Sequence, residues 1–181
     1  MSPKITGGAL NSRKLKSPKG MTVRPTPGRV KESLFSILMN RLDGANVLDL
    51  FAGTGAIGFE AASRGAARVV SVEGHRETAM AIEESVQEFG IGGKVTVVAA
   101  PAERALYRIE GPFDIVYMDP PYANEVPLQL FRLLLERELL APDAVVIYEH
   151  AAKRILPDIP GYRSTREEVY GDVALAFFAR L

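Results

Sequence analysis

The stretch YMDPPY, residues 117–122, places an acid, two consecutive prolines and an aromatic ring directly after the apolar run FDIV. Proline lacks an N–H donor and disfavours helix in the residue before it, so the chain after Asp119 is held extended. We therefore expect a carboxylate, the carbonyl of Pro120 and the ring of Tyr122 to be fixed where a strand ends. Such a set can accept hydrogen bonds from an amine and stack on a flat base. On this stretch alone, a rigid turn in which Tyr122 only packs is an equal alternative.

A glycine motif forms a second candidate site. Gly53, Gly55 and Gly58 have the spacing G-x-G-x-x-G between a predicted strand and a predicted helix. Glycines reach positive φ and let the backbone approach a ligand closely. The next predicted strand ends at Glu73, 20 positions after Gly53, where an acid can bind both hydroxyls of a ribose. This combination predicts a bound nucleoside rather than a structural turn, although Glu73 could also cap the helix that follows it.

The predicted elements alternate between strands and helices, which is typical of a doubly wound α/β fold with a mostly parallel sheet covered by helices on both faces. The strand patterns are at 47–51, 68–73, 95–100, 114–118, 144–149, 166–170 and 173–180, and the helix patterns are at 27–42, 56–64, 76–89, 102–107 and 126–139. Between the last two strands, Gly171-Asp172 has a two-residue hairpin pattern, so we expect an antiparallel ending. We expect an extension at 1–25 and one domain at 26–181.

The composition excludes several kinds of chemistry. The chain has 181 residues, no cysteine, and two histidines, His75 and His150. The lack of cysteine excludes disulfides, thiolate metal sites and a cysteine nucleophile, and we expect no metal. We expect both histidines at the surface or at a helix cap, and Tyr148 in the core. No apolar run matches a membrane span or a signal peptide, so we expect a soluble cytoplasmic protein that does not bind a membrane.

Positive charge is concentrated in the first 41 residues. This segment carries one acid, Glu32, and nine basic residues: Lys4, Arg13, Lys14, Lys16, Lys19, Arg24, Arg29, Lys31 and Arg41. Because the whole chain is neutral, the segment is +8 and the remainder is −8. A basic arm on an acidic body favours a polyanionic partner such as nucleic acid, and a solvated tail is the alternative. The pattern ITGGALNSRKLKSPKG predicts a small β-hairpin in this arm.

Residues beside the two motifs narrow the class of protein. Asp49 and Phe51 precede the glycines, and with DPPY they make the sequence resemble S-adenosyl-L-methionine-dependent methyltransferases with a seven-stranded Rossmann-like sheet. The segments ITGG…RKL, RPTPGRVKESLF, DLFAGTGAIGFEAASRGA and DPPY together resemble the bacterial 16S ribosomal RNA guanine-N2 methyltransferases over nearly the whole chain. That family usually has Thr-Asp where this chain has Pro27-Gly28, so an acid near the rim of the site is missing. A dinucleotide coenzyme also fits the glycines, but a dehydrogenase normally needs a further domain.

The resemblance implies methylation of the exocyclic N2 amine of a guanine in 16S ribosomal RNA. Asp119 and the carbonyl of Pro120 would accept hydrogen bonds from that amine, and Tyr122 would stack on an extruded base. The implied contacts to S-adenosyl-L-methionine are Asp49, Phe51, Gly53, Gly55, Glu73, Ala102 or Glu103, and Asp119. The implied contacts to RNA are Arg13, Lys14, Arg24, Thr26, Arg29, Pro121 and Tyr122.

Two alternatives to this function stay open at the level of sequence. DPPY serves several exocyclic amines, so an adenine-N6 methyltransferase of DNA or RNA is possible within the same class of enzyme. A nucleic-acid-binding protein with a degenerate cofactor pocket is the alternative from another class, and the intact glycines and acids argue against it. We expect a monomer that acts on 16S ribosomal RNA, either within the small ribosomal subunit or on an assembly intermediate.

Overall fold

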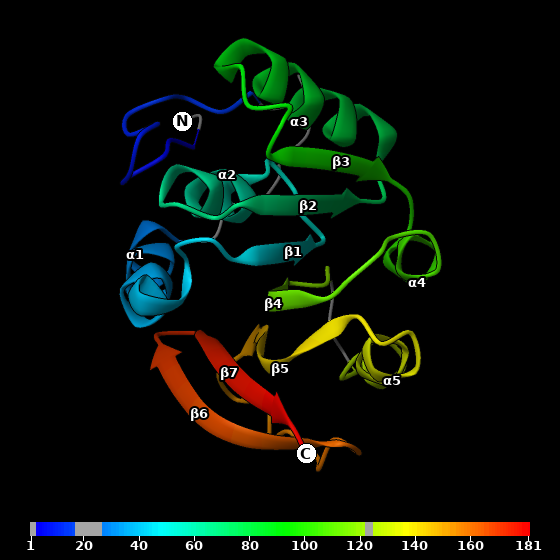
Figure 1. Cartoon of the computed structure of the whole chain (residues 1–181). Helices are drawn as coiled ribbons and strands as arrows, with labels where there is room; N and C mark the ends of the chain where they lie inside the picture. Colours follow the sequence, from blue (N-terminus) through cyan, green and yellow to red (C-terminus); the bar gives the residue numbers. More distant parts are fainter. Residues whose placement is uncertain (1–2, 17–26, 122–124) are drawn as a thin grey trace.

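The computed structural model describes residues 3–16, 27–121 and 125–181. Its strands form a seven-stranded sheet in the order β3-β2-β1-β4-β5-β7-β6 (Figure 1). The strands are β1 (Asn46–Leu50), β2 (Arg68–Glu73), β3 (Val95–Ala99), β4 (Phe113–Met118), β5 (Leu140–Ala151), β6 (Tyr162–Tyr170) and β7 (Val173–Arg180). Strands β1 to β5 pair in parallel, whereas β7 is antiparallel to both β5 and β6. The predicted mostly parallel sheet with a C-terminal antiparallel hairpin is therefore confirmed.

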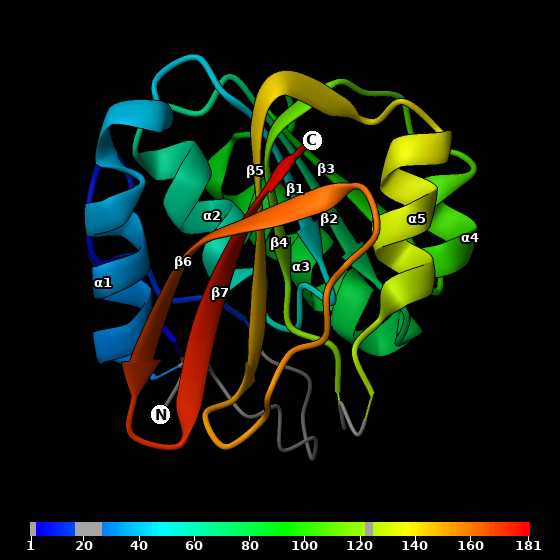
Figure 2. The same cartoon turned by 90° about the horizontal axis from the view of Figure 1, so that it is seen from below.

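Helices cover both faces of this sheet. They are α1 (Gly28–Ile37), α2 (Ala56–Ser63), α3 (Arg76–Phe89), α4 (Ala102–Leu106) and α5 (Leu128–Glu136), with a 3-10 turn η1 (Met39–Arg41). Buried side chains of α1, α2 and α3 form one apolar cluster with the sheet, and those of α4 and α5 form another. Figure 2 shows α1 and α2 on one side of the strands and α4 and α5 on the other. In the described part of the chain, no helix has the length and apolar character needed to cross a membrane.

The central strands have apolar side chains on both faces because a helix layer covers each face. In β1, Leu48 and Leu50 enter the cluster under α4 and α5, whereas Val47 enters the cluster under α1 to α3. In β4, Val116 and Met118 alternate in the same way with Tyr117. This alternation decides which side chains of neighbouring strands share a face at the end of the sheet.

Some element bounds differ from the sequence prediction. The helix predicted at 27–42 is divided, because α1 ends at Ile37 and is followed by η1. The helix predicted at 126–139 is shorter, because α5 begins only after Pro127, whose ring occupies the N-cap position. Strand β5 begins four residues earlier than predicted, because Leu140 pairs with Phe113 of β4.

The β-hairpin predicted in the N-terminal arm is not formed. Residues 3–16 contain an isolated antiparallel bridge between Lys4 and Lys14, without regular strands around it. Ile5 and Leu15, at 1% and 2% exposure, instead belong to the apolar cluster under α1 to α3. The arm fails to extend as a hairpin because its backbone also bonds to α2, as in the 2.8 Å hydrogen bond from Ala9 N–H to the carbonyl of Ser63.

A fully buried glutamate on α2 anchors this arm. The carboxylate of Glu60 accepts hydrogen bonds from the backbone N–H of Thr6 at 2.9 Å and from its hydroxyl at 3.0 Å. It also forms ion pairs with Lys31 at 2.9 Å and Arg64 at 2.8 Å. Burial raises the pKa of Glu60, but the hydrogen bonds and positive charges around it outweigh burial and hold that pKa below its ordinary value. Lys31 also donates to the carbonyl of Lys4 at 2.8 Å, so the arm, α1 and α2 meet at this carboxylate.

Candidate functional site

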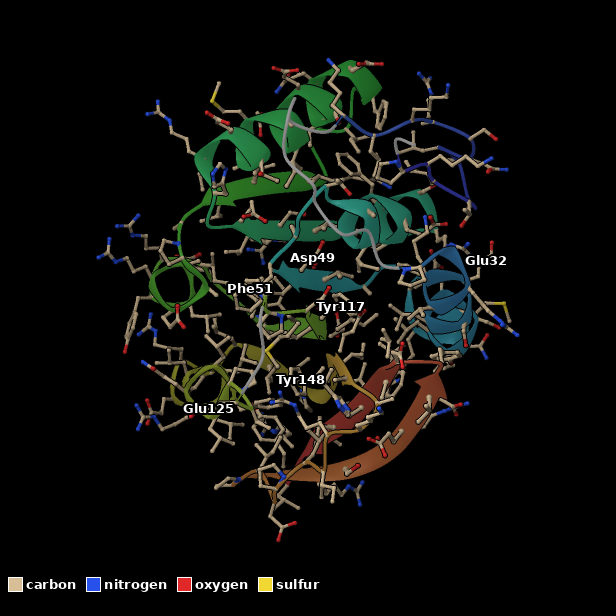
Figure 3. All side chains as sticks on the ribbon, turned by 180° about the vertical axis from the view of Figure 1, so that it is seen from behind. Glu32, Asp49, Phe51, Tyr117, Glu125 and Tyr148 are labelled. Atoms are coloured by element: carbon tan, nitrogen blue, oxygen red, sulfur yellow. The ribbon has the colours of Figure 1, made fainter. Side chains whose placement is uncertain are left out.

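The residues predicted to do chemistry meet at the carboxyl ends of three neighbouring strands. Asp49 lies in β1, Glu73 is the last residue of β2, and Asp119 directly follows β4. The strand order β2-β1-β4 places these ends side by side, and the order of the strands reverses between β1 and β4. Open α/β sheets bind ligands at such a switch point. Figure 3 shows Asp49 and Phe51 at this end of the sheet.

The loop between β1 and α2 has an unusual backbone. Phe51, Gly53 and Gly55 have φ values of 65°, 57° and 77°, in the left-handed region. Glycine adopts this region without penalty, but Phe51 carries a side chain, and strain of this kind is common at ligand sites. A Cβ atom on Gly58 would lie 2.6 Å from Ser71 Oγ, so this glycine allows α2 to pack closely on β2. Gly53 and Gly55 thus permit the left-handed turn and Gly58 permits close packing of the helix on the strand, as expected of a nucleotide-binding turn.

Glu73 connects this loop to the start of α3. Its Oε2 accepts a 2.8 Å hydrogen bond from the N–H of Gly53, and its Oε1 accepts a 2.8 Å hydrogen bond from the N–H of His75. His75 occupies the N-cap position of α3, so Glu73 stabilises the helix start without being its cap residue. Each carboxylate oxygen has two acceptor positions, so both oxygens retain capacity for a further donor. The suggestion that Glu73 caps α3 is thus wrong in detail, because it bonds the N–H of the cap residue instead, and its ribose contact stays a prediction.

Asp49 is a buried acid held in an electrostatically unfavourable place. Its side chain is 1% exposed, and Oδ2 accepts a 3.1 Å hydrogen bond from the N–H of Gly58. Burial raises the pKa of Asp49 to about 7, and the hydrogen bond from Gly58 opposes this rise. The nearby charges of Asp119 and Glu73 raise it further. Three carboxylates that repel one another at one edge favour a positively charged ligand.

The stretch after β4 is only partly described. Asp119 and Pro120 are half-buried, and Pro121 is exposed. Burial raises the pKa of Asp49 in β1 and of Tyr148 in β5, and the charge of Asp119 adds to the rise at both, on the two strands that flank β4. Tyr122 lies outside the described residues, so its stacking role stays a prediction.

The basic residues predicted to contact RNA lie, within the described part of the chain, on the N-terminal arm and on α1. Arg13 and Lys14 are exposed on the arm, and the guanidinium of Arg13 lies 5.6 Å from the ring centroid of Phe89 on α3. Arg29 is exposed in the first turn of α1. Arg24 and Thr26 lie outside the described residues. The cofactor candidate Ala102 is buried at the first position of α4, three residues after β3 ends.

One buried pair of side chains near the site was not predicted from the sequence, and one histidine lies elsewhere than expected. The hydroxyl of Tyr117 donates to Glu149, and both side chains are buried. Tyr117 lies two positions before Asp119 and thus on the same side of an extended chain, and this spacing could have indicated that Tyr117 lies near the site.

His150 was expected at the surface or at a helix cap, but it is 4% exposed and stacks on the buried Tyr148 at 5.3 Å. The expectation was wrong because β5 continues to Ala151 and β7 pairs along it.

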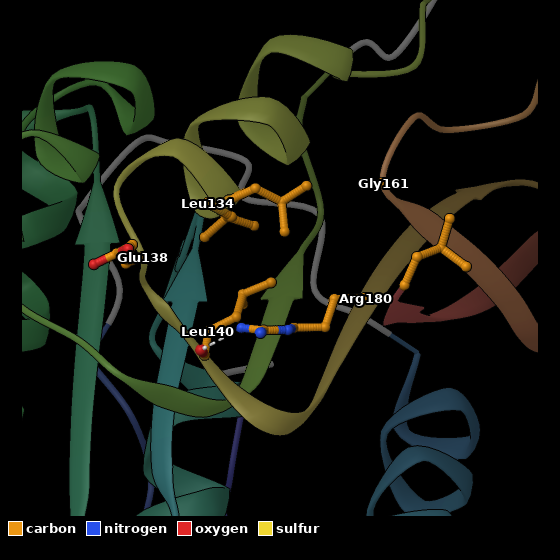
Figure 4. A pocket seen from close by; sticks show the side chains of 7 residues that line it. Leu134, Glu138, Leu140, Gly161 and Arg180 are labelled. Atoms are coloured by element: carbon orange, nitrogen blue, oxygen red, sulfur yellow. Dashed lines mark hydrogen bonds between the residues drawn. The ribbon is translucent and has the colours of Figure 1, made fainter.

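A cavity of about 310 Å³ lies elsewhere, between α5 and the C-terminal strands (Figure 4). Its lining includes Leu134, Leu140 and Arg180, and the guanidinium of Arg180 donates to the carbonyl of Leu140 at 3.5 Å. Leu140 is the first residue of β5, so this cavity lies at the opposite end of that strand from Asp119 and Glu149. It is separate from the candidate site.

The chain matches the family model described as conserved hypothetical protein 95 over residues 3–179. It is 34% identical over 178 residues to ribosomal RNA small subunit methyltransferase D of Escherichia coli strain K12, covering 98% of this chain and 89% of the relative. It is 32% identical over 181 residues to YlbH of Bacillus subtilis strain 168, a protein named provisionally as an rRNA methyltransferase, with 98% of each chain covered.

Solved structures agree with these sequence relationships. The structure of yhhF from Escherichia coli, named provisionally as a methyltransferase, has a TM-score of 0.89 at 32% identity and covers 99% of this chain and 98% of its own. An SAH-bound methyltransferase from Podospora anserina, PaMTH1, has a TM-score of 0.66 at 15% identity over 87% of this chain and 79% of its own, which is a likeness in fold alone. The chain therefore belongs to the conserved hypothetical protein 95 family of methyltransferases, together with ribosomal RNA small subunit methyltransferase D.

Proposed function

We propose that this protein uses S-adenosyl-L-methionine to methylate the exocyclic N2 amine of a guanine in 16S ribosomal RNA. The observation that carries the proposal is the position of Asp119 and Pro120, directly after β4 and beside the glycine loop of β1. The relative from Escherichia coli, whose name assigns it to small-subunit ribosomal RNA, supports the choice of RNA.

The described residues fit this cofactor. S-adenosyl-L-methionine carries a sulfonium, an ammonium and a ribose, and when bound it supplies an electrophilic methyl group. Burial raises the pKa of Asp49 most, and repulsion from Asp119 and Glu73 adds to the rise, so a cation placed among the three acids relieves this repulsion. Gly53 and Gly55 keep their positive φ without side chains, so the backbone can pass close to the amino-acid part of the cofactor. Glu73 would bind the ribose, and Phe51 and Ala102 would line the site.

The chain itself would prepare the amine for attack. The lone pair of an exocyclic guanine amine is delocalised into the ring, which makes the nitrogen a poor nucleophile. Asp119 and the carbonyl of Pro120 would each accept one N–H, which favours a pyramidal nitrogen and stabilises the positive charge that develops on it. The two prolines would hold both acceptors in place, and much of the rate enhancement would come from this positioning. Tyr122 would stack on the base.

RNA would be held by the basic arm and the start of α1. Arg13, Lys14 and Arg29 are exposed and could neutralise phosphates. Arg24, Thr26 and Pro121 are further proposed contacts. We propose a monomer in the cytoplasm, with an extension at 1–25 and a methyltransferase domain at 26–181, acting on the small ribosomal subunit or on an assembly intermediate.

The test is nucleoside analysis after reaction. Small-subunit ribosomal RNA, naked or in assembled subunits, is incubated with the protein and isotope-labelled S-adenosyl-L-methionine, digested to nucleosides and analysed by mass spectrometry. We expect labelled N2-methylguanosine, and we expect the near-isosteric Asp119→Asn variant to lower the single-turnover rate about a hundredfold to a thousandfold with little change in cofactor affinity. If the labelled product is N6-methyladenosine, the substrate base is adenine and not guanine. Cofactor-independent RNA binding without any transfer would favour the binding-protein alternative.

A further inference from the structure

The buried pair of Tyr117 and Glu149 lies at the same edge of the sheet as the candidate site. The hydroxyl of Tyr117 donates a hydrogen bond to Glu149 Oε2, and the two residues are 2% and 8% exposed. Tyr117 is also the register partner of Asp49 on the adjacent strand β1, and Figure 3 shows these two residues close together. Tyr148 belongs to the cluster under α4 and α5, so its neighbour Glu149 points to the other face, where Tyr117 lies.

Glu149 and Asp119 occupy corresponding positions after the last paired residues of β5 and β4. The last parallel pair between β4 and β5 joins Met118 to Tyr148. Asp119 and Glu149 each follow this pair by one residue, and adjacent strands lie about 4.8 Å apart. The acid that we assign to the target amine therefore has a second carboxylate at the corresponding position of the next strand, β5, which continues to Ala151.

A second acceptor in this place matches guanine and opposes adenine. An ionised carboxylate accepts hydrogen bonds and cannot donate them. The Watson–Crick edge of guanine presents an N1–H donor next to the N2 amine, whereas adenine presents the N1 lone pair next to its N6 amine. A base that places its amine on Asp119 would turn N1 toward Glu149. Guanine would then form a second hydrogen bond, and adenine would bring a lone pair against a negative charge.

The tyrosine gives this carboxylate a defined orientation. A buried acid is costly unless it is hydrogen-bonded, and the Tyr117 hydroxyl occupies one acceptor position on Oε2. The hydroxyl comes from β4, the strand that ends in Asp119. Tyr117 thus links the orientation of Glu149 to the strand that carries the amine acceptor.

We propose that Glu149, oriented by Tyr117, accepts the N1–H of the target guanine and thereby selects guanine over adenine. Glu149 is a specificity-determining residue in this proposal, and Tyr117 is a positioning residue. The proposal rests on the proposed function, because it assumes that Asp119 holds the N2 amine of a guanine.

The probe is 2-aminopurine, which keeps the exocyclic amine at position 2 but has a lone pair in place of N1–H. RNA is ligated so that guanine or 2-aminopurine occupies the position that the parent enzyme methylates. Single-turnover rates and half-saturating RNA concentrations are then compared for the parent and for Glu149→Gln, whose side-chain amide can donate to N1. We expect the parent to prefer guanine, and we expect Glu149→Gln to lower that preference about tenfold to a hundredfold, the range of one well-placed base-edge contact.

Two further variants complete the experiment. Tyr117→Phe should reduce the preference for guanine by a smaller factor, because the carboxylate stays but loses its orienting donor. Glu168→Gln makes the same chemical change at a half-buried position of β6, where Glu168 pairs with Arg166 at 2.7 Å, and should leave the preference unchanged. Cofactor affinity measured by calorimetry should be equal in all four proteins, which separates a specificity effect from a general loss of structure.

The outcomes distinguish this inference from the proposed function. If the parent forms N2-methylguanosine and Glu149→Gln keeps the parent's preference within about threefold, Glu149 does not read N1. A parent that methylates guanine and 2-aminopurine equally would also overturn the inference. A parent that methylates only adenine would instead refute the proposed function itself.

Discussion

Replacing Asp49 by asparagine should make the protein more stable above neutral pH. Between about pH 4 and pH 7, the folded state binds more protons than the unfolded state, because burial raises the pKa of Asp49 from 3.8 to about 7. The stability of the parent should therefore fall as the pH rises through this range and then stop falling. At about 1.4 kcal/mol for each unit of pKa, the ionised carboxylate costs of order 4 kcal/mol above pH 7.

The asparagine variant removes this cost and keeps the local hydrogen bond. Its amide oxygen can still accept the bond that Gly58 N–H donates to Oδ2 of Asp49 at 3.1 Å. We expect the variant to exceed the parent by about 2–4 kcal/mol at about pH 8 and by about 1–2 kcal/mol at about pH 5, and to match it only below about pH 4. Comparing the two proteins at each pH cancels the titration of every group that does not interact with Asp49.

Urea unfolding over this pH range measures the difference directly. Asp158→Asn, at an exposed position, is the matched control and should behave as the parent.

The affinity of the parent for S-adenosyl-L-methionine should fall below about pH 7, by up to tenfold for each pH unit, because the cofactor cation favours ionised Asp49. Asp49→Asn should bind weakly and without this pH dependence. An asparagine variant less stable than the parent at high pH would refute the reasoning.

Three other perturbations probe the remaining parts of the structure. Glu73→Ala should weaken cofactor binding about tenfold to a hundredfold by calorimetry, because charged hydrogen bonds contribute roughly 1.5–3 kcal/mol each, and unchanged affinity would remove Glu73 from the site. Lys31→Met should cost about 3–5 kcal/mol in urea unfolding, because Glu60 loses one of its buried partners, and a cost below about 1 kcal/mol would contradict the anchoring role. Neutralising Arg13 and Lys14 should make RNA binding less dependent on salt. The slope of log binding constant against log salt concentration should become shallower by about 0.7 for each phosphate that the arm no longer neutralises. An unchanged slope would mean that the arm does not touch RNA.

The sequence was sufficient for features that depend on local patterns. The bounds predicted for β2 and α3 agree with the structure, because three of the six residues of β2 are valine and α3 has a regular apolar face that stops at Gly90, with a φ of 66°. The same strand pattern placed Glu73 at the end of β2. These features need no knowledge of how distant segments meet.

Features that depend on long-range contacts were not predictable. The bond between Tyr117 and Glu149 joins residues 32 positions apart and depends on the register of β4 against β5. The arm contains a plausible hairpin pattern, but its docking on α2 depends on Glu60, 54 positions after Thr6. No local sequence pattern indicates that Glu60 accepts hydrogen bonds from the arm.

Helix α2 connects the basic arm to the glycine loop between β1 and α2. Its N-cap is Gly55, in the glycine loop, and its C-terminal half carries the acceptors for the arm: Glu60 and the carbonyl of Ser63. A helix of 8 residues is stiff over this length, so the docked part of the arm has a defined position relative to the loop. Removing the arm would also take Ile5 and Leu15 out of the apolar cluster, so a truncation would change stability as well as RNA binding. Point substitutions on the exposed face of the arm are therefore the cleaner means of separating RNA affinity from the integrity of the methyltransferase fold.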